Sequence, residues 1–457
     1  MKLLLLPFSL LVSMQLTAQH TAKAYTEFKN NKLLSNATTT LYVVDCDTKK
    51  VVFEHNKQIS ITPASTLKLF TTISALELLG GNNMFVTPLV FNTATHTLHI
   101  GANYDPTWGS EHFEANSFTT QLTTLIKTKR WNVAQLHLHI SPYDAQPTNP
   151  NWLWGDMGNY FGTAAASINW RDNKLTCYFN TTNTGDSALL VKCSPKPNSL
   201  RIINSVIASQ KKGDNTIAYS TANNPTLQVI GELPAHQTNY EVEVNNPLIT
   251  ELFAQDIKQQ LSINTIKFNT DAMPQNTTDT ASITSPKLAQ LVYHTNIKSL
   301  NLYAESILKH IATSKKWDVK NDVIITQLIN YWKPFANNQG LDIQDGCGLS
   351  PMNKVTSEFT TQLLQHAYTQ SYYGTLVQSL PVMSQSGSLS NMCKGTIAEG
   401  RVMAKTGYIH GVRAYSGYVK TLSNKTLAFS FVVNNFTCSA SETKKLMEAV
   451  FVAMVQE

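Results

Sequence analysis

Residues 62–80 read TPASTLKLFTTISALELLG, and the rest of the chain can be interpreted relative to this stretch. Thr62 can cap a helix through its hydroxyl, and a proline suits the following position because the first turn of a helix makes no use of that N–H group. Apolar side chains then recur at helical spacing until a pair of glycines ends the run at Gly80. The stretch therefore predicts a buried helix that begins near Thr62.

Ser65 and Lys68 lie three positions apart at the start of this helix, so they share one face of its first turn. A serine hydroxyl is a poor nucleophile at neutral pH and needs a base within hydrogen-bond reach. A lysine can be that base where burial or nearby positive charge favours its neutral form. The pattern S-x-x-K also occurs by chance, and the plain alternative is a solvated first turn. The catalytic interpretation therefore requires partners elsewhere in the chain.

The first eighteen residues have the character of a secretory signal. Lys2 precedes an apolar run over residues 3–16, and the small residue Ala18 offers a cleavage point before Gln19. The run is short for a membrane span and is interrupted by polar residues. We expect residues 1–18 to be removed near Ala18 and the mature protein to be exported, to the periplasm if the host has two membranes. An uncleaved anchor is the alternative.

Composition narrows the range of partners. The 457 residues carry a net charge of +6, and only 14% of them are charged. No basic run or aromatic-basic stripe is present, so we expect no nucleic-acid partner. Twelve histidines are scattered without a metal-binding pattern, so we expect no metal and no cofactor.

Six cysteines are an even number for an exported chain, so disulfides are one alternative to free thiols. Cys177 and Cys193 flank a turn-rich segment and could close a hairpin. Cys347 and Cys393 fall in expected loops. The sequence leaves the pairing open.

The chain divides into three parts by its pattern of apolar, polar and turn-forming residues. Residues 40–54 predict a β-hairpin that leads into the Ser65 helix. Residues 84–280 contain short alternating runs separated by Asn, Thr, Pro and Gly, which indicate a β-rich insertion of one or two subdomains. Helices and antiparallel strands return in residues 281–457. We therefore expect a discontinuous α+β catalytic domain, residues 19–83 and 281–457, around the insertion.

Two further short motifs follow the insertion. Ser299 and Asn301 lie on the connector between two expected helices, where polar side chains often act only as caps. Lys405, Thr406 and Gly407 form K-T-G within an expected strand. Each motif is weak alone, but S-x-x-K, S-x-N and K-T-G stand here in order on a helix start, an interhelical loop and a strand.

This constellation resembles the penicillin-binding proteins and serine β-lactamases. The long interval between the first two motifs is similar to that of the D-alanyl-D-alanine carboxypeptidase/endopeptidase family, the class C low-molecular-mass penicillin-binding proteins, which carry inserted domains there. Other segments agree, namely Asp105–Thr107, Gly158–Gly162, Asn169–Arg171, Asp345–Ser350 and Leu380–Val382. The resemblance implies a transpeptidase-like fold, an antiparallel sheet flanked by helices.

The resemblance also implies roles for the catalytic residues. Ser65 attacks the carbonyl of a terminal D-Ala-D-Ala peptide and becomes an acyl ester, with Lys68 as its base. Ser299 relays the proton to the leaving amine, helped by Lys405, whose positive charge keeps Lys68 neutral. The backbone N–H groups of Ser65 and Tyr408 form the oxyanion hole.

The remaining residues are assigned to the substrate. Asn301 hydrogen-bonds the substrate amide, and Lys405 with Thr406 binds the terminal carboxylate. Gly407 lacks a side chain, so the peptide can lie along the strand as an added strand. The implied partners are peptidoglycan stem peptides ending in D-Ala-D-Ala, and β-lactam antibiotics as covalent inhibitors.

Three positions depart from the family pattern. Leu300 stands where the family usually has Asp, and Cys347 replaces the usual Ser of the Gly-rich loop. Tyr408 follows K-T-G where the family prefers a small hydroxyl residue, so we expect its ring to crowd the cleft.

Two alternatives to the carboxypeptidase remain. A β-lactamase needs a positioned base for rapid deacylation, and no residue marks one. A catalytically inactive cell-wall-binding homologue would keep the fold without turnover. Endopeptidase action on D-alanyl cross-links and the oligomeric state stay open.

Overall fold

The computed structural model describes residues 19–275 and 279–457. The predicted signal peptide, residues 1–18, lies outside the described residues. The described chain forms two compact units. The first unit takes residues 19–77, Val292–Ser299 and Ile325–Glu457, and the second takes Leu78–Leu291 and Leu300–Ile324.

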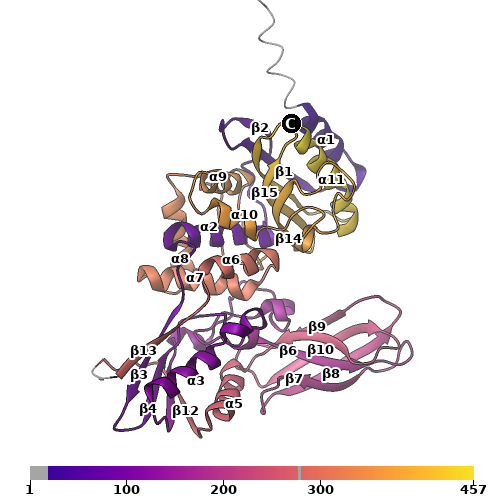
Figure 1. Ribbon diagram of the computed structural model, residues 1–457. Helices are drawn as coiled ribbons and strands as arrows, with labels where there is room; N and C mark the ends of the chain where they lie inside the picture. Colours follow the sequence, from indigo (N-terminus) through magenta and orange to yellow (C-terminus); the bar gives the residue numbers. More distant parts are fainter. Residues whose placement is uncertain (1–18, 276–278) are drawn as a thin grey trace, which may run out of the picture. The chain divides into compact units, whose positions relative to one another are not determined.

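A five-stranded antiparallel sheet forms the centre of the first unit, in the order β14-β15-β16-β1-β2. Figure 1 shows the first and last parts of the chain side by side in this sheet, because β1 pairs with β16. Its strands are β1 Thr38–Asp45, β2 Val51–His55, β14 Val402–Ile409, β15 Val412–Lys420 and β16 Thr426–Asn434. The β-hairpin predicted for residues 40–54 is confirmed, because β1 pairs with β2.

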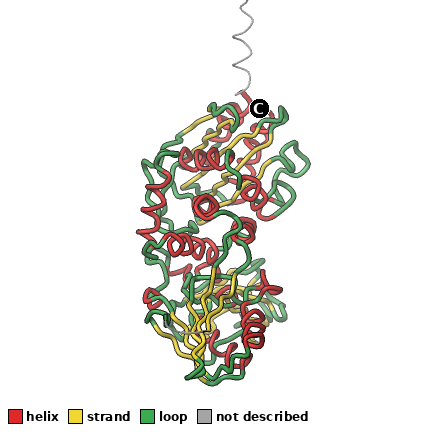
Figure 2. The backbone as a smooth tube through the Cα atoms, turned by 60° about the vertical axis from the view of Figure 1, so that its left-hand side comes forward, coloured by secondary structure: helices red, strands yellow, loops and turns green. Residues whose placement is uncertain are grey.

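Helices cover both faces of this sheet (Figure 2). On one face α1 and α11 pack against alternate residues of β16, where Phe429 and Phe431 contact Phe451 of α11. On the other face Thr361 of α9 donates to Tyr42 O, and the Tyr418 hydroxyl donates to Leu364 O. The helices are α1 Gln19–Lys29, α2 Lys68–Leu79, α9 Ser357–Tyr368, α10 Tyr373–Ser379 and α11 Ala440–Gln456, with 3-10 turns η1 Lys32–Leu34, η2 Ala64–Leu67 and η7 Gly387–Leu389.

The last helix begins with a capping box. Ser439 accepts a hydrogen bond from the Glu442 N–H, and the Glu442 carboxylate accepts from the Ser439 N–H. This capping box satisfies two backbone donors at the start of α11.

The second unit contains three sheets, ordered β12-β5-β4-β3-β13, β11-β6-β7 and β8-β10-β9. Its strands are β3 Val86–Asn92, β4 Thr97–Gly101, β5 Gln135–His139, β6 Lys174–Asn180, β7 Leu189–Ser194, β8 Arg201–Ser209, β9 Asn215–Tyr219, β10 Thr226–Pro234, β11 Tyr240–Asn245, β12 Thr265–Asn269 and β13 Asp279–Thr284. Its helical elements are η3 Glu111–Asn116, α3 Phe118–Lys129, η4 Pro142–Ala145, α4 Trp154–Met157, η5 Tyr160–Gly162, η6 Arg171–Asn173, α5 Ile249–Leu261 and α7 Asn301–Lys315. Helices α6 Leu288–Ile297 and α8 Asn321–Trp332 belong partly to each unit.

The boundaries of the two units differ from the predicted domain limits. The prediction ended the insertion at residue 280. Strand β13 pairs along β3, so residues 279–284 belong to the sheet of the second unit. Residues 300–324 also belong to the second unit. Asn169, in a loop of that unit, donates a hydrogen bond to Ser306 of α7. The domain limits themselves stay a prediction.

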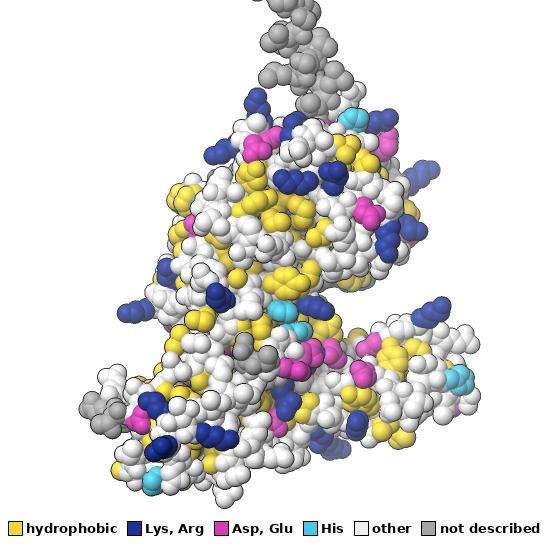
Figure 3. All heavy atoms as spheres, in the orientation of Figure 1, with side chains coloured by type: hydrophobic (Ala, Val, Ile, Leu, Met, Phe, Trp, Pro, Cys, Tyr) yellow, Lys and Arg dark blue, Asp and Glu magenta, His cyan; other side chains and the backbone are white. Residues whose placement is uncertain are grey.

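The surface carries few charges. On the face shown in Figure 3, acidic and basic side chains are interspersed with neutral ones. Among residues 19–275 and 279–457, no helix combines the length and the apolar character needed to cross a membrane.

Cys177 and Cys193 lie directly opposite each other in the β6–β7 ladder, and both are thiols in this structure. A hydrogen bond between them, together with burial, raises the pKa of the Cys177 thiol. We expect an oxidant such as oxidised glutathione to join them, because cross-strand partners lie within the distance that a disulfide spans.

Closing this loop is expected to raise the free energy of unfolding by about 3 kcal/mol. The measurement is the urea midpoint of the oxidised protein with and without a reductant, and Cys193→Ser is the control that should show no reductant dependence. Equal midpoints for the oxidised and reduced wild-type protein would refute the pairing.

Candidate active site

Ser65 lies in a 3-10 turn that directly precedes α2. The prediction that Thr62 caps an α-helix containing Ser65 is wrong, because α2 begins only at Lys68. Ala64 has a φ of +46°, which no α-helix accommodates, and the Thr62 hydroxyl instead donates to Pro351 O at 3.2 Å. Residues three apart lie nearly over one another in a 3-10 turn, so Ser65 and Lys68 remain neighbours.

Lys68 and Ser65 are in direct contact. Lys68 Nζ lies 2.9 Å from Ser65 Oγ and 2.7 Å from Cys347 O, and the lysine is fully buried. Ser65 is only partly buried. Ser65, which is accessible to a substrate, is therefore hydrogen-bonded to a base that is shielded from water, Lys68.

The loop that presents Cys347 O is held by a buried carboxylate. Asp345 accepts hydrogen bonds from the N–H groups of Cys347 at 3.2 Å, Gly348 at 2.6 Å and Ser350 at 2.7 Å. A Cβ at Gly348, which has a φ of +83°, would lie 1.9 Å from Ala64 O. Cys347 thus serves the site through its carbonyl group, so its thiol in place of a hydroxyl leaves this contact intact.

Lys405 and Ser299 form a second pair of the same kind. Lys405 Nζ lies 2.9 Å from Ser299 Oγ and 2.9 Å from Thr406 O. Burial lowers the pKa of Lys405 well below its usual range, and repulsion from Lys68, whenever Lys68 is protonated, lowers it further. Ser299 has a φ of +62°, a left-handed conformation that a serine rarely adopts and that is often retained at functional sites.

Strand β14 runs against the Ser65 turn at Gly407. A Cβ on Gly407 would lie 2.6 Å from Pro63 O and 3.1 Å from both Ala64 Cβ and the Ser65 nitrogen. Only glycine allows this approach, which brings the start of Tyr408 near the Ser65 N–H group. The oxyanion hole predicted from Ser65 and Tyr408 stays a prediction that this approach supports.

The Tyr408 ring has a cation as its neighbour. Tyr408 and Arg413 pair across β14 and β15, and the Arg413 guanidinium carbon lies 4.8 Å from the ring centre. The ring is 54% exposed. Crowding of the cleft by this ring stays a prediction.

Asn301 belongs to the second unit, whereas the other predicted site residues belong to the first. It is buried, and its amide Nδ2 donates to Phe161 O at 2.7 Å. Leu300, the residue before it, is the N-cap of α7 and makes no side-chain capping bond.

Sequence reasoning missed two residues beside K-T-G. Ser388 Oγ lies 2.7 Å from Thr406 Oγ1, but Ser388 falls in a Ser-rich stretch without a motif. Arg413 becomes a neighbour of Tyr408 only through strand register. A search for hydroxyl and cationic residues close to K-T-G in the sequence could have found Arg413, which follows Tyr408 shortly along the chain, but not Ser388.

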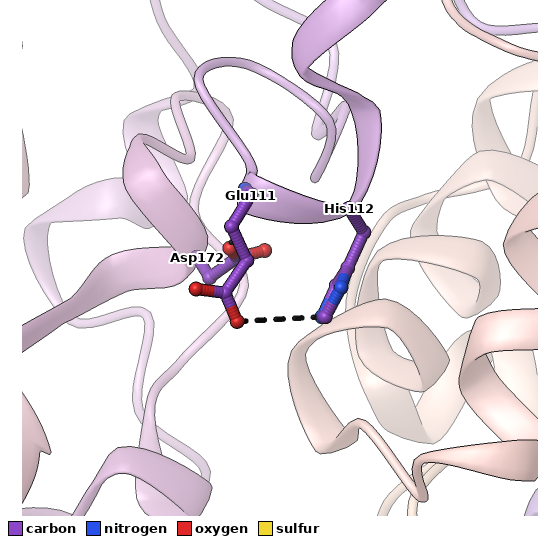
Figure 4. Close-up of side chains that lie close together, drawn as sticks. All are labelled: Glu111, His112 and Asp172. Atoms are coloured by element: carbon purple, nitrogen blue, oxygen red, sulfur yellow. Dashed lines mark hydrogen bonds and ion pairs between the residues drawn. The ribbon is translucent and has the colours of Figure 1, made fainter.

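A separate cluster in the second unit comes close to a metal-ligand arrangement. The ligand atoms of Glu111, His112 and Asp172 lie within 4.8 Å of one another (Figure 4). However, Lys174 Nζ lies 3.0 Å from Glu111 Oε1 and 2.6 Å from Glu243 Oε1. A lysine already supplies positive charge here, so we interpret the cluster as an ion-pair network.

The chain is similar to known proteins in sequence and in fold. The sequence matches the D-Ala-D-Ala carboxypeptidase 3 (S13) family over residues 23–456. It is 27% identical to a D-alanyl-D-alanine carboxypeptidase from Actinomadura sp., over 94% of this chain and 85% of the relative. It is 23% identical to penicillin-sensitive carboxypeptidase A from Dictyostelium discoideum, over 89% of this chain and 84% of that relative.

Among solved structures, penicillin-binding protein 4 from Haemophilus influenzae has the same fold. The TM-score is 0.75 at 19% identity, and the match covers 94% of this chain and 97% of that one. The predicted α+β fold of the penicillin-binding protein type is therefore confirmed. The family match covers nearly the whole described chain, including both serine–lysine pairs, and the protein belongs to the D-Ala-D-Ala carboxypeptidase 3 (S13) family of serine peptidases.

Proposed function

We propose that this protein removes terminal D-alanine from peptidoglycan stem peptides through an acyl-enzyme on Ser65. The observation that carries the proposal is the contact of buried Lys68 Nζ with Ser65 Oγ at 2.9 Å. The second pair, Lys405 and Ser299, supplies a proton relay and a cation for the peptide carboxylate.

Acylation begins when Ser65 Oγ attacks the carbonyl carbon of the D-Ala–D-Ala bond and its proton passes to neutral Lys68. The negative oxygen of the tetrahedral intermediate accepts hydrogen bonds from the N–H groups of Ser65 and Tyr408, each worth about 3 kcal/mol. Ser299 relays the proton from Lys68 to the leaving amine as the C–N bond breaks. Free D-alanine leaves, and the rest of the peptide stays as an ester on Ser65.

Deacylation uses the same base. Lys68 takes a proton from a water molecule, which attacks the ester carbonyl and frees the shortened peptide. The proton then returns to Ser65 Oγ. A β-lactam enters by the same attack, but its opened ring stays attached to the acyl group and does not leave. The penicillin sensitivity named for the Dictyostelium discoideum relative supports this step.

The test compares a pentapeptide ending in D-Ala-D-Ala with a D-alanyl cross-linked dimer, using the wild-type protein and Ser65→Ala. We expect the wild-type protein to release D-alanine from the pentapeptide and Ser65→Ala to release none. Cleavage of the dimer would add endopeptidase action. Inactivity of the folded wild-type protein on both peptides would favour the inactive cell-wall-binding homologue, whereas rapid repeated hydrolysis of penicillin would favour a β-lactamase.

We further propose that the protein acts outside the cytoplasm, since its substrate lies there and residues 1–18 have the composition of a secretory signal. In a host with two membranes, we expect the mature chain in the periplasmic fraction, beginning at Gln19. N-terminal sequencing and cell fractionation measure this. A full-length chain in the membrane fraction would mean that the apolar run is retained as an anchor.

A further inference from the structure

A hydroxyl from outside the three motifs lies beside K-T-G. Ser388 Oγ and Thr406 Oγ1 are 2.7 Å apart, and either can be the donor. Ser388 is exposed and Thr406 is partly buried. Two hydroxyl groups therefore meet at the solvent-accessible side of strand β14.

The loop that carries Ser388 is fixed by its neighbours. Gly387 has a φ of +54°, and a Cβ there would lie 3.0 Å from Ile297 Cδ1 and 3.1 Å from Pro381 Cβ. Leu389, on the other side of Ser388, is fully buried in the core of the first unit. The backbone of Ser388 is therefore held by the packing of the residues on both sides of it.

The same loop is braced by two side-chain hydrogen bonds. Ser386 Oγ accepts from the Val382 N–H at 3.0 Å, and Ser384 Oγ donates to Met392 O at 2.6 Å. Ser388 differs from these serines because its hydroxyl points to a predicted substrate-binding side chain.

We propose that Ser388 is a substrate-binding residue that holds the terminal carboxylate of the substrate together with Thr406. This rests on the proposed function. In the free protein the two hydroxyls share one hydrogen bond, and when the anion binds each can donate its own hydrogen to a carboxylate oxygen. Lys405 Nζ donates to Thr406 O at 2.9 Å, so this lysine is bonded to one of the two residues of the proposed carboxylate site.

Ser388 also bears on the departure from the family pattern at position 408. The family prefers a small hydroxyl residue after K-T-G, and here Tyr408 occupies that position with its ring next to Arg413. Ser388 supplies a small hydroxyl beside Thr406 from a different segment of the chain.

The test measures second-order acylation rates with benzylpenicillin, which has a free carboxylate, and with its methyl ester, which has none. Ser388→Ala is expected to slow acylation by benzylpenicillin about tenfold, the usual effect of losing a hydrogen bond to a charged group. The rate with the ester should change less than about twofold, because the missing hydroxyl has no anion to bind. Ser388→Thr should restore the benzylpenicillin rate, and Ser390→Ala is the matched control in the same loop.

The outcomes separate the possibilities. Equal slowing with the acid and the ester would overturn the proposal, since Ser388 would then only position Thr406. An unchanged rate with benzylpenicillin in a variant with wild-type melting temperature would overturn it as well. If the wild-type protein formed no adduct with either compound, the proposed function itself would fail, and the assignment of Ser388 with it.

Discussion

Gly407→Ala is expected to slow acylation by benzylpenicillin about a hundredfold, the effect of losing one oxyanion-hole donor. The added Cβ would lie 2.6 Å from Pro63 O and 3.1 Å from the Ser65 nitrogen. Since both neighbours are backbone atoms, either β14 or the Ser65 turn must move, and the N–H groups of Ser65 and Tyr408 lose their alignment.

The matched control for this change is Gly374→Ala. A Cβ on Gly374 has no atom within 4 Å, and the residue lies in helix α10, where alanine is the better helix former. This variant should acylate at the wild-type rate. A wild-type rate in Gly407→Ala would mean that the close approach of β14 to Ser65 has no part in the reaction.

Lys405→Met is expected to slow acylation at least about a hundredfold, because it removes both the partner of Ser299 and a cation of the carboxylate site. Methionine is unbranched, uncharged and one heavy atom shorter than lysine, and the site is fully buried. Lys420→Met, at an exposed lysine at the end of the neighbouring strand β15, is the control that should keep the wild-type rate.

The same variant should alter how stability depends on pH. The ordinary pKa of a lysine is 10.5, whereas burial, with the charge of Lys68, holds the pKa of Lys405 well below that in the folded chain. Between these two values the unfolded chain binds more protons, so the free energy of unfolding falls as the pH falls. Lys405→Met removes this contribution.

Urea unfolding from pH 10 to pH 7 measures this effect. The wild-type protein should lose stability toward pH 7 relative to Lys405→Met, while Lys420→Met should follow the wild-type curve. Parallel curves for the wild-type protein and Lys405→Met would contradict the lowered pKa of Lys405.

Sequence reasoning succeeded where the residues concerned are close along the chain or belong to a strongly patterned element. The hairpin of β1 and β2, predicted for residues 40–54, is local, because two short apolar runs are joined by a turn. The contact of Ser65 with Lys68 was predicted correctly although the helix start was wrong, because an α-helix and a 3-10 turn both bring residues three apart together.

It failed where tertiary contacts decide the structure. Helix α3 has the sequence FTTQLTTLIKTK, whose threonines have low helix propensity. The helix forms because its side chains Phe118 and Leu122 are buried in the core of the second unit. The start of α2 depends on the positive φ of Ala64, whose turn packs against Gly348 and Gly407 from distant segments. The contact of Ser388 with Thr406 depends on the path of a loop that no pattern in the sequence marks.

The central claim is that Ser65 carries the acyl group, and intact-protein mass spectrometry after incubation with benzylpenicillin tests it most directly. The wild-type protein should gain the mass of one intact benzylpenicillin, and peptide mapping should locate that mass on the peptide containing Ser65. Ser65→Ala, with an unchanged melting temperature, should gain none. An adduct of the same mass that persists in Ser65→Ala on another residue would contradict the account.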